Sequence, residues 1–255
     1  MLEKAEYASY CDRFHKVWSY LKKNSENQDK TIYEICEIRG YEVDRMEDIL
    51  SKAEFIKLKD DCNTKILKKM GNDLALFSKD DNFLVEGRYL FPVKDMFGNI
   101  IAIIGWYPDE KKYITTPSKF FSKTCLFYGM EQIGQTGIGK TYFLTEGIFD
   151  SLSIRSLGYN ALAMMGIDCS RYKTALYSLF KRVIAIPDID EQGKKVIKFD
   201  KWSLPANSKY FRWSGVSPEK VKDIDVFINM FEYDDIHELL SEIPNEKKRI
   251  VTYEF

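Results

Sequence analysis

Residues 141–231 alternate between short apolar runs and longer amphipathic runs, and this alternation constrains the fold more than any other feature. The apolar runs are TYFLTEG, NALAMMG, RVIAIPD and KYFRW, and a stretch with helical character follows each one. Strands that alternate with helices of about 10–15 residues are typical of βαβ units in a parallel sheet. Right-handed crossovers put the carboxyl ends of these strands on one edge, where open α/β sheets bind their ligands. The sequence therefore predicts an α/β fold with a site at that edge.

Acidic residues follow the predicted strands at this shared edge. In chain order they are Glu146, Asp168, Asp188, Asp190, Asp223 and Asp225. Carboxylates gathered in a dry site repel one another unless a cation lies between them. A set of Glu and Asp oxygens without Cys or His is what Mg²⁺ or Mn²⁺ takes. Asp188 and Asp190 are two residues apart, so along an extended segment both side chains point the same way and suit one ion or a pair of ions.

Each of these acids also has a simpler interpretation. A Glu-Gly pair after a strand is usually the start of a loop. A single Asp-x-Asp is often a solvated turn or a helix N-cap, and Asp150 alone fits the first turn of a helix, where the dipole favours an acid. The run from Lys222 to Asp225 fits a charged turn. The order of the acids along one βαβ array is what makes a metal site the more specific hypothesis.

A glycine-rich stretch, GQTGIGKT, matches the spacing of a phosphate-binding P-loop. A P-loop follows a strand and opens a helix, whereas a predicted strand begins directly after this stretch. We therefore expect a connector here.

The rest of the chain divides into three further regions. Apolar residues at helical spacing predict a helical N-terminal region over 1–82. The runs FLVEGRYLFPV and GNIIAIIGWYP, joined by turn residues, predict an antiparallel hairpin within a basic α+β subdomain over 83–139. We expect the catalytic domain at 140–235 and a C-terminal tail at 236–255.

Composition excludes several classes of protein. The net charge is −1, so a nucleic-acid contact must come from a local cluster of Lys and Arg. Five cysteines without a CxxC pair, and only two histidines, argue against zinc and favour reduced thiols. Neither a signal peptide nor an apolar run long enough to span a bilayer is present. The sequence therefore predicts a soluble cytoplasmic protein that does not associate with membranes.

The glutamate after the first strand and the Asp-x-Asp after the third resemble the TOPRIM domain, the metal-binding module of primases and topoisomerases. The preceding region resembles the RNA-polymerase region of bacterial DnaG-type primases, with Arg88 before LFPVKDMFGN, then KKYITTP, Lys123 and LFYG. LTEGIFDSLSI, IAIPDIDEQGKKVI and VKDIDVFI resemble further segments of that family. The resemblance covers roughly residues 83–230. Thr115 and Thr124 depart from the family pattern in the region of the template and nucleotide contacts. Pro187 and Ile189 replace small or polar residues around Asp188 and Asp190, and both carboxylates remain.

The resemblance implies a TOPRIM-type parallel sheet preceded by a smaller α+β primase subdomain. It implies a DNA primase that joins ribonucleoside triphosphates into short RNA primers on single-stranded DNA, with two or more Mg²⁺ or Mn²⁺ ions and no zinc. Glu146, Asp188 and Asp190 are then the catalytic and metal-binding residues, and Asp223 and Asp225 bind metal too. Asp150, Gly147 and Gly193 would support them. The nucleotide and template contacts would be Arg88, Lys112, Lys123, Gly166, Lys194 and Lys222.

The family's zinc ribbon and helicase-binding domain have no counterpart in this sequence. We therefore expect a phage or mobile-element primase that works with a replicative helicase or with a separate zinc-ribbon initiation protein. Two other hypotheses stay open: a TOPRIM nuclease that uses the same metals to cut nucleic acid, and a non-catalytic primase-like module that only binds nucleic acid or helicase.

Overall fold

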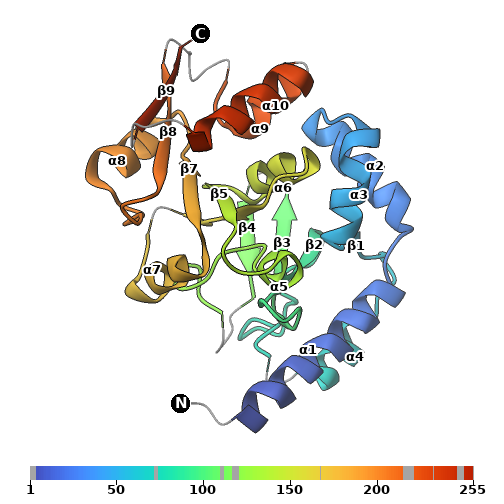
Figure 1. Cartoon of the computed structure of the whole chain (residues 1–255). Coiled ribbons are helices and arrows are strands. Elements are labelled where there is room, and N and C mark those ends of the chain that lie inside the picture. The colour runs from blue at the N-terminus through green and yellow to red at the C-terminus, as the bar shows by residue number, and fades with distance from the viewer. Residues whose placement is uncertain are drawn as a thin grey trace. The chain divides into compact units, whose positions relative to one another are not determined.

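The computed structural model describes residues 4–71, 74–109, 112–116, 121–166, 168–214, 221–231, 233–245 and 250–254. The chain forms two compact units, Met1–Ser122 and Lys123–Phe255. Each unit contains its own sheet, with helices packed against it (Figure 1). The expected mixed architecture, an antiparallel region followed by a parallel one, is confirmed.

The N-terminal unit combines helices with an antiparallel sheet. Its helices are α1 (Lys4–Lys23), α2 (Gln28–Arg39), α3 (Val43–Lys52) and α4 (Thr64–Met70). Its strands are β1 (Ile56–Lys57), β2 (Tyr89–Lys94), β3 (Ile100–Tyr107) and β4 (Lys112–Thr115), in the order β1-β2-β3-β4. The predicted hairpin is β2–β3, and its turn is closed by Asp95, whose Oδ1 accepts from the amides of Phe97 and Asn99.

Helix α1 packs on this sheet because its apolar residues recur at three- and four-residue spacings. Phe14, Val17 and Leu21 are fully buried and share one core cluster with Ile103 of β3. The helical prediction for 1–82 misses β1, a short strand whose Ile56 pairs with Leu90 at one edge of the sheet.

The C-terminal unit is built on a parallel sheet. Its strands are β5 (Thr141–Thr145), β6 (Ala161–Ala163), β7 (Arg182–Ile186), β8 (Lys209–Ser214) and β9 (Ile250–Glu254). Among the described residues they form five strands in the order β6-β5-β7-β8-β9, and every pairing is parallel. The helical elements are α5 (Glu131–Thr136), α6 (Ile148–Ser156), α7 (Arg171–Leu176), η1 (Tyr177–Leu179), α8 (Glu191–Phe199), α9 (Ile224–Met230), α10 (Tyr233–Glu242) and η2 (Ile243–Asn245).

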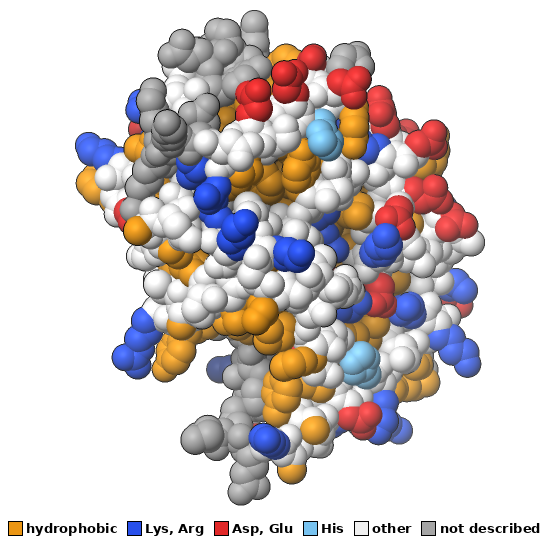
Figure 2. Space-filling model, viewed as in Figure 1, with side chains coloured by type: hydrophobic (Ala, Val, Ile, Leu, Met, Phe, Trp, Pro, Cys, Tyr) orange, Lys and Arg blue, Asp and Glu red, His pale blue; other side chains and the backbone are white. Residues whose placement is uncertain are grey.

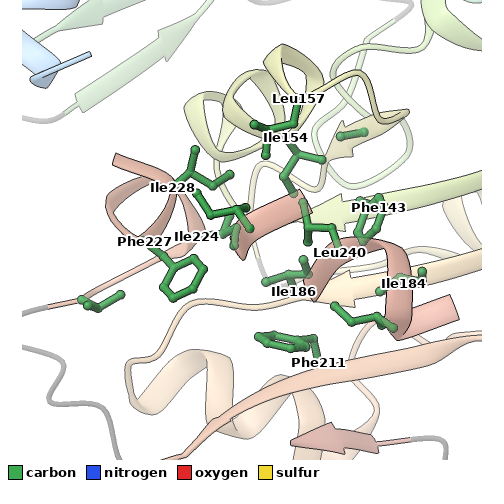
Figure 3. Close-up of a cluster of buried hydrophobic side chains, with 14 of the residues drawn as sticks. Phe143, Ile154, Leu157, Ile184, Ile186, Phe211, Ile224, Phe227, Ile228 and Leu240 are labelled. Atoms are coloured by element: carbon green, nitrogen blue, oxygen red, sulfur yellow. The ribbon is translucent and has the colours of Figure 1, made fainter. Parts of the chain in front are cut away.

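The core of this unit lies between the sheet and the helices α6, α9 and α10 (Figure 3). Phe143 and Ile184 project from adjacent strands, and Ile224, Phe227 and Leu240 join the same cluster from the helices. The strands are apolar along most of their length because a parallel sheet is buried on both faces. The sheet therefore offers polar side chains mainly where its strands end.

The structure corrects the expected domain boundaries at residues 123–139. These residues belong to the C-terminal unit, although we assigned them to the basic subdomain. Tyr128 and Ala163 exchange two backbone hydrogen bonds, of 3.0 and 3.1 Å, and the Gln132 side chain donates to the carbonyl of Ala161. The glycine-rich stretch connects two elements as expected, since α5 ends within it at Thr136 and β5 begins at its last residue, Thr141, the reverse of the context of a P-loop.

The expected C-terminal tail is wrong. Helix α10 contributes Ile236 and Leu240 to the core, and β9 pairs with β8 over five residue pairs. Without β9, strand β8 would expose unpaired backbone groups along its length. None of the described helices combines the length and the apolar character needed to cross a bilayer.

Candidate active site

The register of the parallel sheet brings Glu146 and Asp188 together. Thr145, the last residue of β5, pairs with Ile186, the last residue of β7. The chain therefore leaves the sheet at Glu146 on one strand and at Pro187 and Asp188 on its neighbour. The predicted convergence of acids at this edge follows directly from the parallel pairing, because adjacent strands end at the same level.

Glu146 is a half-buried acid with one buried, unsatisfied oxygen. Among the described residues, its Oε2 atom has no hydrogen-bond partner. Burial raises the pKa of this carboxyl, the charge of Asp190 raises it further, and the backbone amide of Asp188 and the Lys222 ammonium act in the opposite direction. Its main chain is held firmly, since the carbonyl of Glu146 accepts from the amide of Met165 at 2.9 Å. The backbone is thus fixed while the side chain lacks a full set of partners.

The pKa of Asp188 is strongly raised. Burial, together with the charges of Glu146, Asp223 and Asp190, raises its pKa to about 8, and Lys222 opposes the shift. Like charges close together in a dry site disfavour ionisation of each group. Four carboxylates, from the ends of β5 and β7 and from the start of α9, therefore act on one another at this edge.

Two of these acids also cap helices. Asp190 is the N-cap of α8, and its Oδ1 accepts from the amides of Gln192 and Gly193, both at 2.8 Å. Asp223 is the N-cap of α9, and its Oδ1 accepts from the amide of Val226 at 2.9 Å. The capping interpretation and the site interpretation are therefore compatible, because the cap bonds fix each side chain at the edge.

Gly193 and Gly147 allow the backbone to pass close to these acids. A Cβ atom on Gly193 would lie 1.8 Å from the carbonyl oxygen of Asp188, and one on Gly147 would lie 2.3 Å from Oδ2 of Asp150. Both distances are far inside van der Waals contact. The first turn of α8 can therefore approach the end of β7 only with glycine at 193.

Asp150 and Asp225 form a second acidic group behind the first. Asp150 Oδ2 accepts from the amide of Gly147 at 2.9 Å, and its Oδ1 accepts from the amide of Asp225 at 3.4 Å. Asp225 accepts from the Ser153 hydroxyl, and its side chain is almost completely buried. This group joins α6 to α9 and holds the Glu146–Gly147 turn. The geometry gives Asp225 a supporting position, next to Asp150.

The acids at the edge have the chemistry of a divalent-metal site. They supply hard oxygen ligands, Glu146 has an orphaned buried oxygen, and burial together with neighbouring carboxylates raises the pKa values of Glu146 and Asp188. In the part of the chain that the structure describes, no three His, Cys, Asp or Glu side chains already stand close enough to enclose an ion. The donor set fits Mg²⁺ or Mn²⁺, and coordination would require these side chains to turn toward a common point.

The basic residues predicted for the C-terminal unit differ in their surroundings. Lys222 is exposed and close enough to act on both Glu146 and Asp188, and its carbonyl accepts from the amide of Ile189 at 2.9 Å. Lys194 is exposed and pairs with Glu191 at 2.6 Å. Lys123 is half-buried, and burial lowers its pKa. Gly166 has a φ of 135° in the turn after β6.

Arg88 and Lys112 belong to the N-terminal unit. Arg88 packs against Gly105, where a Cβ atom would lie 2.7 Å from its Cδ, and its guanidinium lies 5.5 Å from the ring centroid of Tyr107. Within the described residues, Nη1 of Arg88 is buried without a hydrogen-bond partner. Lys112 begins β4 and is exposed.

Lys173 was missed by the sequence analysis. It lies in α7, is fully buried, and donates from Nζ to the carbonyls of Lys123 at 2.6 Å and of Met164 at 2.8 Å. One lysine in an amphipathic helix normally predicts a solvated residue, so no signal in the sequence identifies it.

Comparisons with known proteins agree with this geometry. Residues 143–228 match the family model described as Toprim-like. A DNA primase of Clostridium acetobutylicum is 26% identical over 208 residues, which are 69% of this chain and 35% of that protein. The match thus spans about a third of the length of this curated relative.

Two solved structures share the fold over most of the chain. A DnaG primase catalytic domain bound to single-stranded DNA has a TM-score of 0.69 and 15% identity, covering 91% of this chain and 80% of that one. A primase of Aquifex aeolicus, comprising zinc-binding and RNA-polymerase domains, has a TM-score of 0.69 and 22% identity, covering 91% of this chain and 60% of that one.

Residues 143–228 of the C-terminal unit are thus similar to the Toprim-like family over about a third of the chain. The chain as a whole has the fold of DnaG-type primase catalytic cores, and the resemblance predicted from the sequence is confirmed.

Proposed function

We propose that this chain is the catalytic core of a DNA primase, which makes short RNA primers on single-stranded DNA by metal-dependent nucleotidyl transfer. The observation that carries the proposal is the position of Glu146 and Asp188 just beyond the ends of the adjacent strands β5 and β7, each with a raised pKa and Glu146 with an orphaned oxygen. Such mutual repulsion in a buried site is relieved by cations, and a nucleoside triphosphate arrives with them.

In this proposal the 3′-hydroxyl of the growing primer attacks the α-phosphate of a ribonucleoside triphosphate, and pyrophosphate leaves. Two or more Mg²⁺ or Mn²⁺ ions would supply charge neutralisation and activation of the attacking oxygen. Glu146, Asp188 and Asp190 hold these ions, with Asp223 beside them. Asp150 and Gly147 fix the turn that carries Glu146. Asp225 takes part through its contacts with Asp150 and Ser153.

The basic residues bind phosphate in this proposal. Lys222 is close enough to lower the pKa of Glu146 and of Asp188, which supports a role in binding the triphosphate beside them. Lys123 and Arg88 suit the template or the nucleotide, since a half-buried cation and an orphaned guanidinium nitrogen both gain from an anionic partner. Lys112, Lys194 and the backbone at Gly166 complete the proposed contacts.

The nucleic acid must avoid one surface of the C-terminal unit. Figure 2 shows Asp and Glu side chains gathered over α10. Its exposed acids are Asp234, Asp235, Glu238 and Glu242. This stretch repels a phosphate backbone, so the template must approach from another direction. We further propose that the chain acts in the cytoplasm with a replicative helicase or a zinc-ribbon initiation protein.

Primer synthesis tests the proposal directly. The purified chain is incubated with single-stranded templates, four ribonucleotides and Mg²⁺ or Mn²⁺, with and without an annealed primer. We expect labelled RNA whose sequence follows the template. Glu146→Gln and Asp188→Asn should each lower synthesis by at least about 100-fold, in line with the loss of a key electrostatic group in other enzymes. Asp234→Asn, on the exposed surface of α10, is the matched control and should retain synthesis.

Other outcomes would replace the proposal. Cutting of a labelled single strand with Mg²⁺ alone would identify a nuclease that uses the same carboxylates. Binding of single-stranded DNA with neither synthesis nor cutting would identify a non-catalytic module. Retained synthesis after Glu146→Gln or Asp188→Asn would show that the metal assignment is wrong.

A further inference from the structure

Lys173 is a buried cation held by main-chain carbonyls. Lysine is almost never fully buried unless it is paired, and this side chain has no exposed surface. Its Nζ donates to the carbonyl oxygens of Lys123 and Met164, and it lies 5.1 Å from the ring centroid of Phe127. Carbonyl oxygens and the face of an aromatic ring both present negative charge to an ammonium. The surroundings are therefore those of a small cation site that the protein fills with its own side chain.

The two carbonyls belong to segments that are far apart in the chain. Lys123 begins the segment that enters the C-terminal unit and pairs with β6 at Tyr128. Met164 directly follows β6. The amide of Ser170 donates to the carbonyl of Thr124 at 3.1 Å, so the loop before α7 holds the same entering segment. Lys173 thus joins three parts of the chain at one atom.

One of these parts is directly connected to the acids at the sheet edge. The amides of Met164 and Met165 donate to the carbonyls of Thr145 and Glu146, at 2.8 and 2.9 Å. Met165 has a positive φ of 59°, and Gly166 follows with 135°. A non-glycine residue in the left-handed region persists only where its surroundings fix it. The carbonyl of Met164, immediately before this turn, is one of the two that Lys173 holds.

We propose that Lys173 is a positioning residue, a tethered monovalent cation that fixes Lys123 and the turn after Met164 relative to Glu146. Lys123 is then presented to phosphate from a defined backbone position. The effect on catalysis rests on the proposed primase function, whereas the effect on the backbone does not.

The charge state is compatible with this role. Burial lowers the pKa of Lys173 to about 8, while Cys169, Cys125 and Asp168 favour the charged form. These are the titratable groups that face it among the described residues, and the ammonium is the main form at neutral pH. Removal of the side chain should leave two inward-facing carbonyls that a free ammonium ion can bind.

Chemical rescue tests the proposal. Lys173→Met keeps the length of the side chain and removes the charge, and Lys173→Ala leaves space for a small cation. We expect Lys173→Met to raise the KM for nucleotides on the order of tenfold, with a smaller change in kcat, because the phosphate contact is misplaced while the acids remain. In Lys173→Ala, added ammonium or methylammonium should restore the KM, whereas tetramethylammonium at the same ionic strength should not. Lys181→Met, at an exposed lysine, is the matched control.

Amide hydrogen exchange gives a readout that needs no activity. The amides of Met165 and Ser170 should exchange at least about tenfold faster in Lys173→Ala than in the wild type, and ammonium should slow them again. Wild-type protein without primer synthesis would contradict the proposed function and leave this readout intact. Unchanged exchange in Lys173→Ala, or accelerated exchange that ammonium does not slow, would overturn the positioning role. If Lys173→Met fails to fold, the alanine variant prepared in ammonium supplies the same comparison.

Discussion

Two acidic groups lie close together at one end of the parallel sheet, and they differ in how their charge is accommodated. Asp150 and Asp225 are buried, and Gly147, Ser153 and the backbone of α9 donate hydrogen bonds to them. Glu146 and Asp188 are partly buried. Burial and the charge of Asp190 raise the pKa of Glu146, and burial and the charge of Glu146 raise the pKa of Asp188. The first group is satisfied by the fold, while the second is left with excess negative charge.

This difference separates scaffold from site. A buried acid whose oxygens accept hydrogen bonds contributes to stability, because its removal leaves buried donors unpaired. A buried acid without such partners destabilises the fold and persists where a ligand compensates it. Burial of a carboxylate alone therefore does not identify a functional residue. A carboxylate that lacks compensating partners is the better indication of a functional residue.

The largest expected effect comes from breaking the satisfied group. Asp150→Ala should lower the free energy of unfolding by about 2–4 kcal/mol, because the amides of Gly147 and Asp225 lose their acceptor in a buried place. Asp188→Asn should instead raise the stability of the metal-free protein by about 1–2 kcal/mol at neutral pH. Folding must bring Asp188 into its protonated form at this pH, and asparagine removes the cost of that proton uptake. Urea unfolding in the presence of a chelator measures both. If Asp150→Ala and Asp188→Asn lower the free energy of unfolding by similar amounts, the distinction between scaffold acids and site acids is wrong.

Gly193→Ala tests the packing that holds the site. The new Cβ would lie 1.8 Å from the carbonyl oxygen of Asp188, so α8 must move away from the end of β7. We expect a loss of about 2–3 kcal/mol in the free energy of unfolding, as for overpacked cores, together with weaker Mn²⁺ binding. Calorimetric titration and thermal unfolding provide the two measurements. Gly158→Ala has a positive φ but open space around it, so it should lower stability and leave Mn²⁺ binding unchanged.

Much of the site could be predicted from the sequence because parallel strands end at one level. The alternation over 141–231 predicts a βαβ array, and in such an array Glu146 and Asp188 follow the ends of parallel strands, which the structure shows to be adjacent. The hairpin before it was also predictable, because turn residues separate two strongly apolar runs. Periodicity and strand ends are local patterns, and local patterns can be recognised in a single sequence.

The remaining features depend on contacts between distant segments. The segment 250–254 is short and lies after the last motif, and only its pairing with β8 makes it a strand. Asp225 looked like a ligand from its spacing, whereas its bond from Ser153 depends on how α6 packs against α9. The burial of Lys173 could not be predicted for the same reason, because its partners are carbonyls of residues 9 and 50 positions away in the sequence.

The pH dependence of metal binding follows from the raised pKa values at the edge. A folded-state pKa above the usual range means that the folded protein binds more protons than the unfolded chain, so metal-free stability falls as pH rises from about 4 to about 8. A metal ion must displace that proton. Mn²⁺ affinity should therefore increase by up to about tenfold per pH unit, or 1.4 kcal/mol, and level off above about pH 8. Calorimetric titrations across this range check the slope, and a flat profile would show that Asp188 is already ionised without metal.

The smallest expected effects distinguish two lysines near the acids. Lys222 acts on Glu146 and Asp188, whereas Lys194 pairs with exposed Glu191 at 2.6 Å. An exposed ion pair contributes roughly 0–1 kcal/mol, so Lys194→Met should change stability and the nucleotide KM by about twofold or less. Lys222→Met removes a cation that acts on both carboxylates and should raise the nucleotide KM by roughly three- to tenfold, which corresponds to one lost charge contact with phosphate. Steady-state kinetics at equal ionic strength measure the nucleotide KM of both variants. Equal increases in KM would mean that the electrostatic field of the whole C-terminal unit, and not Lys222 itself, attracts the triphosphate. A larger increase in KM for Lys194→Met would mean that the triphosphate binds over α8 and not beside Glu146 and Asp188.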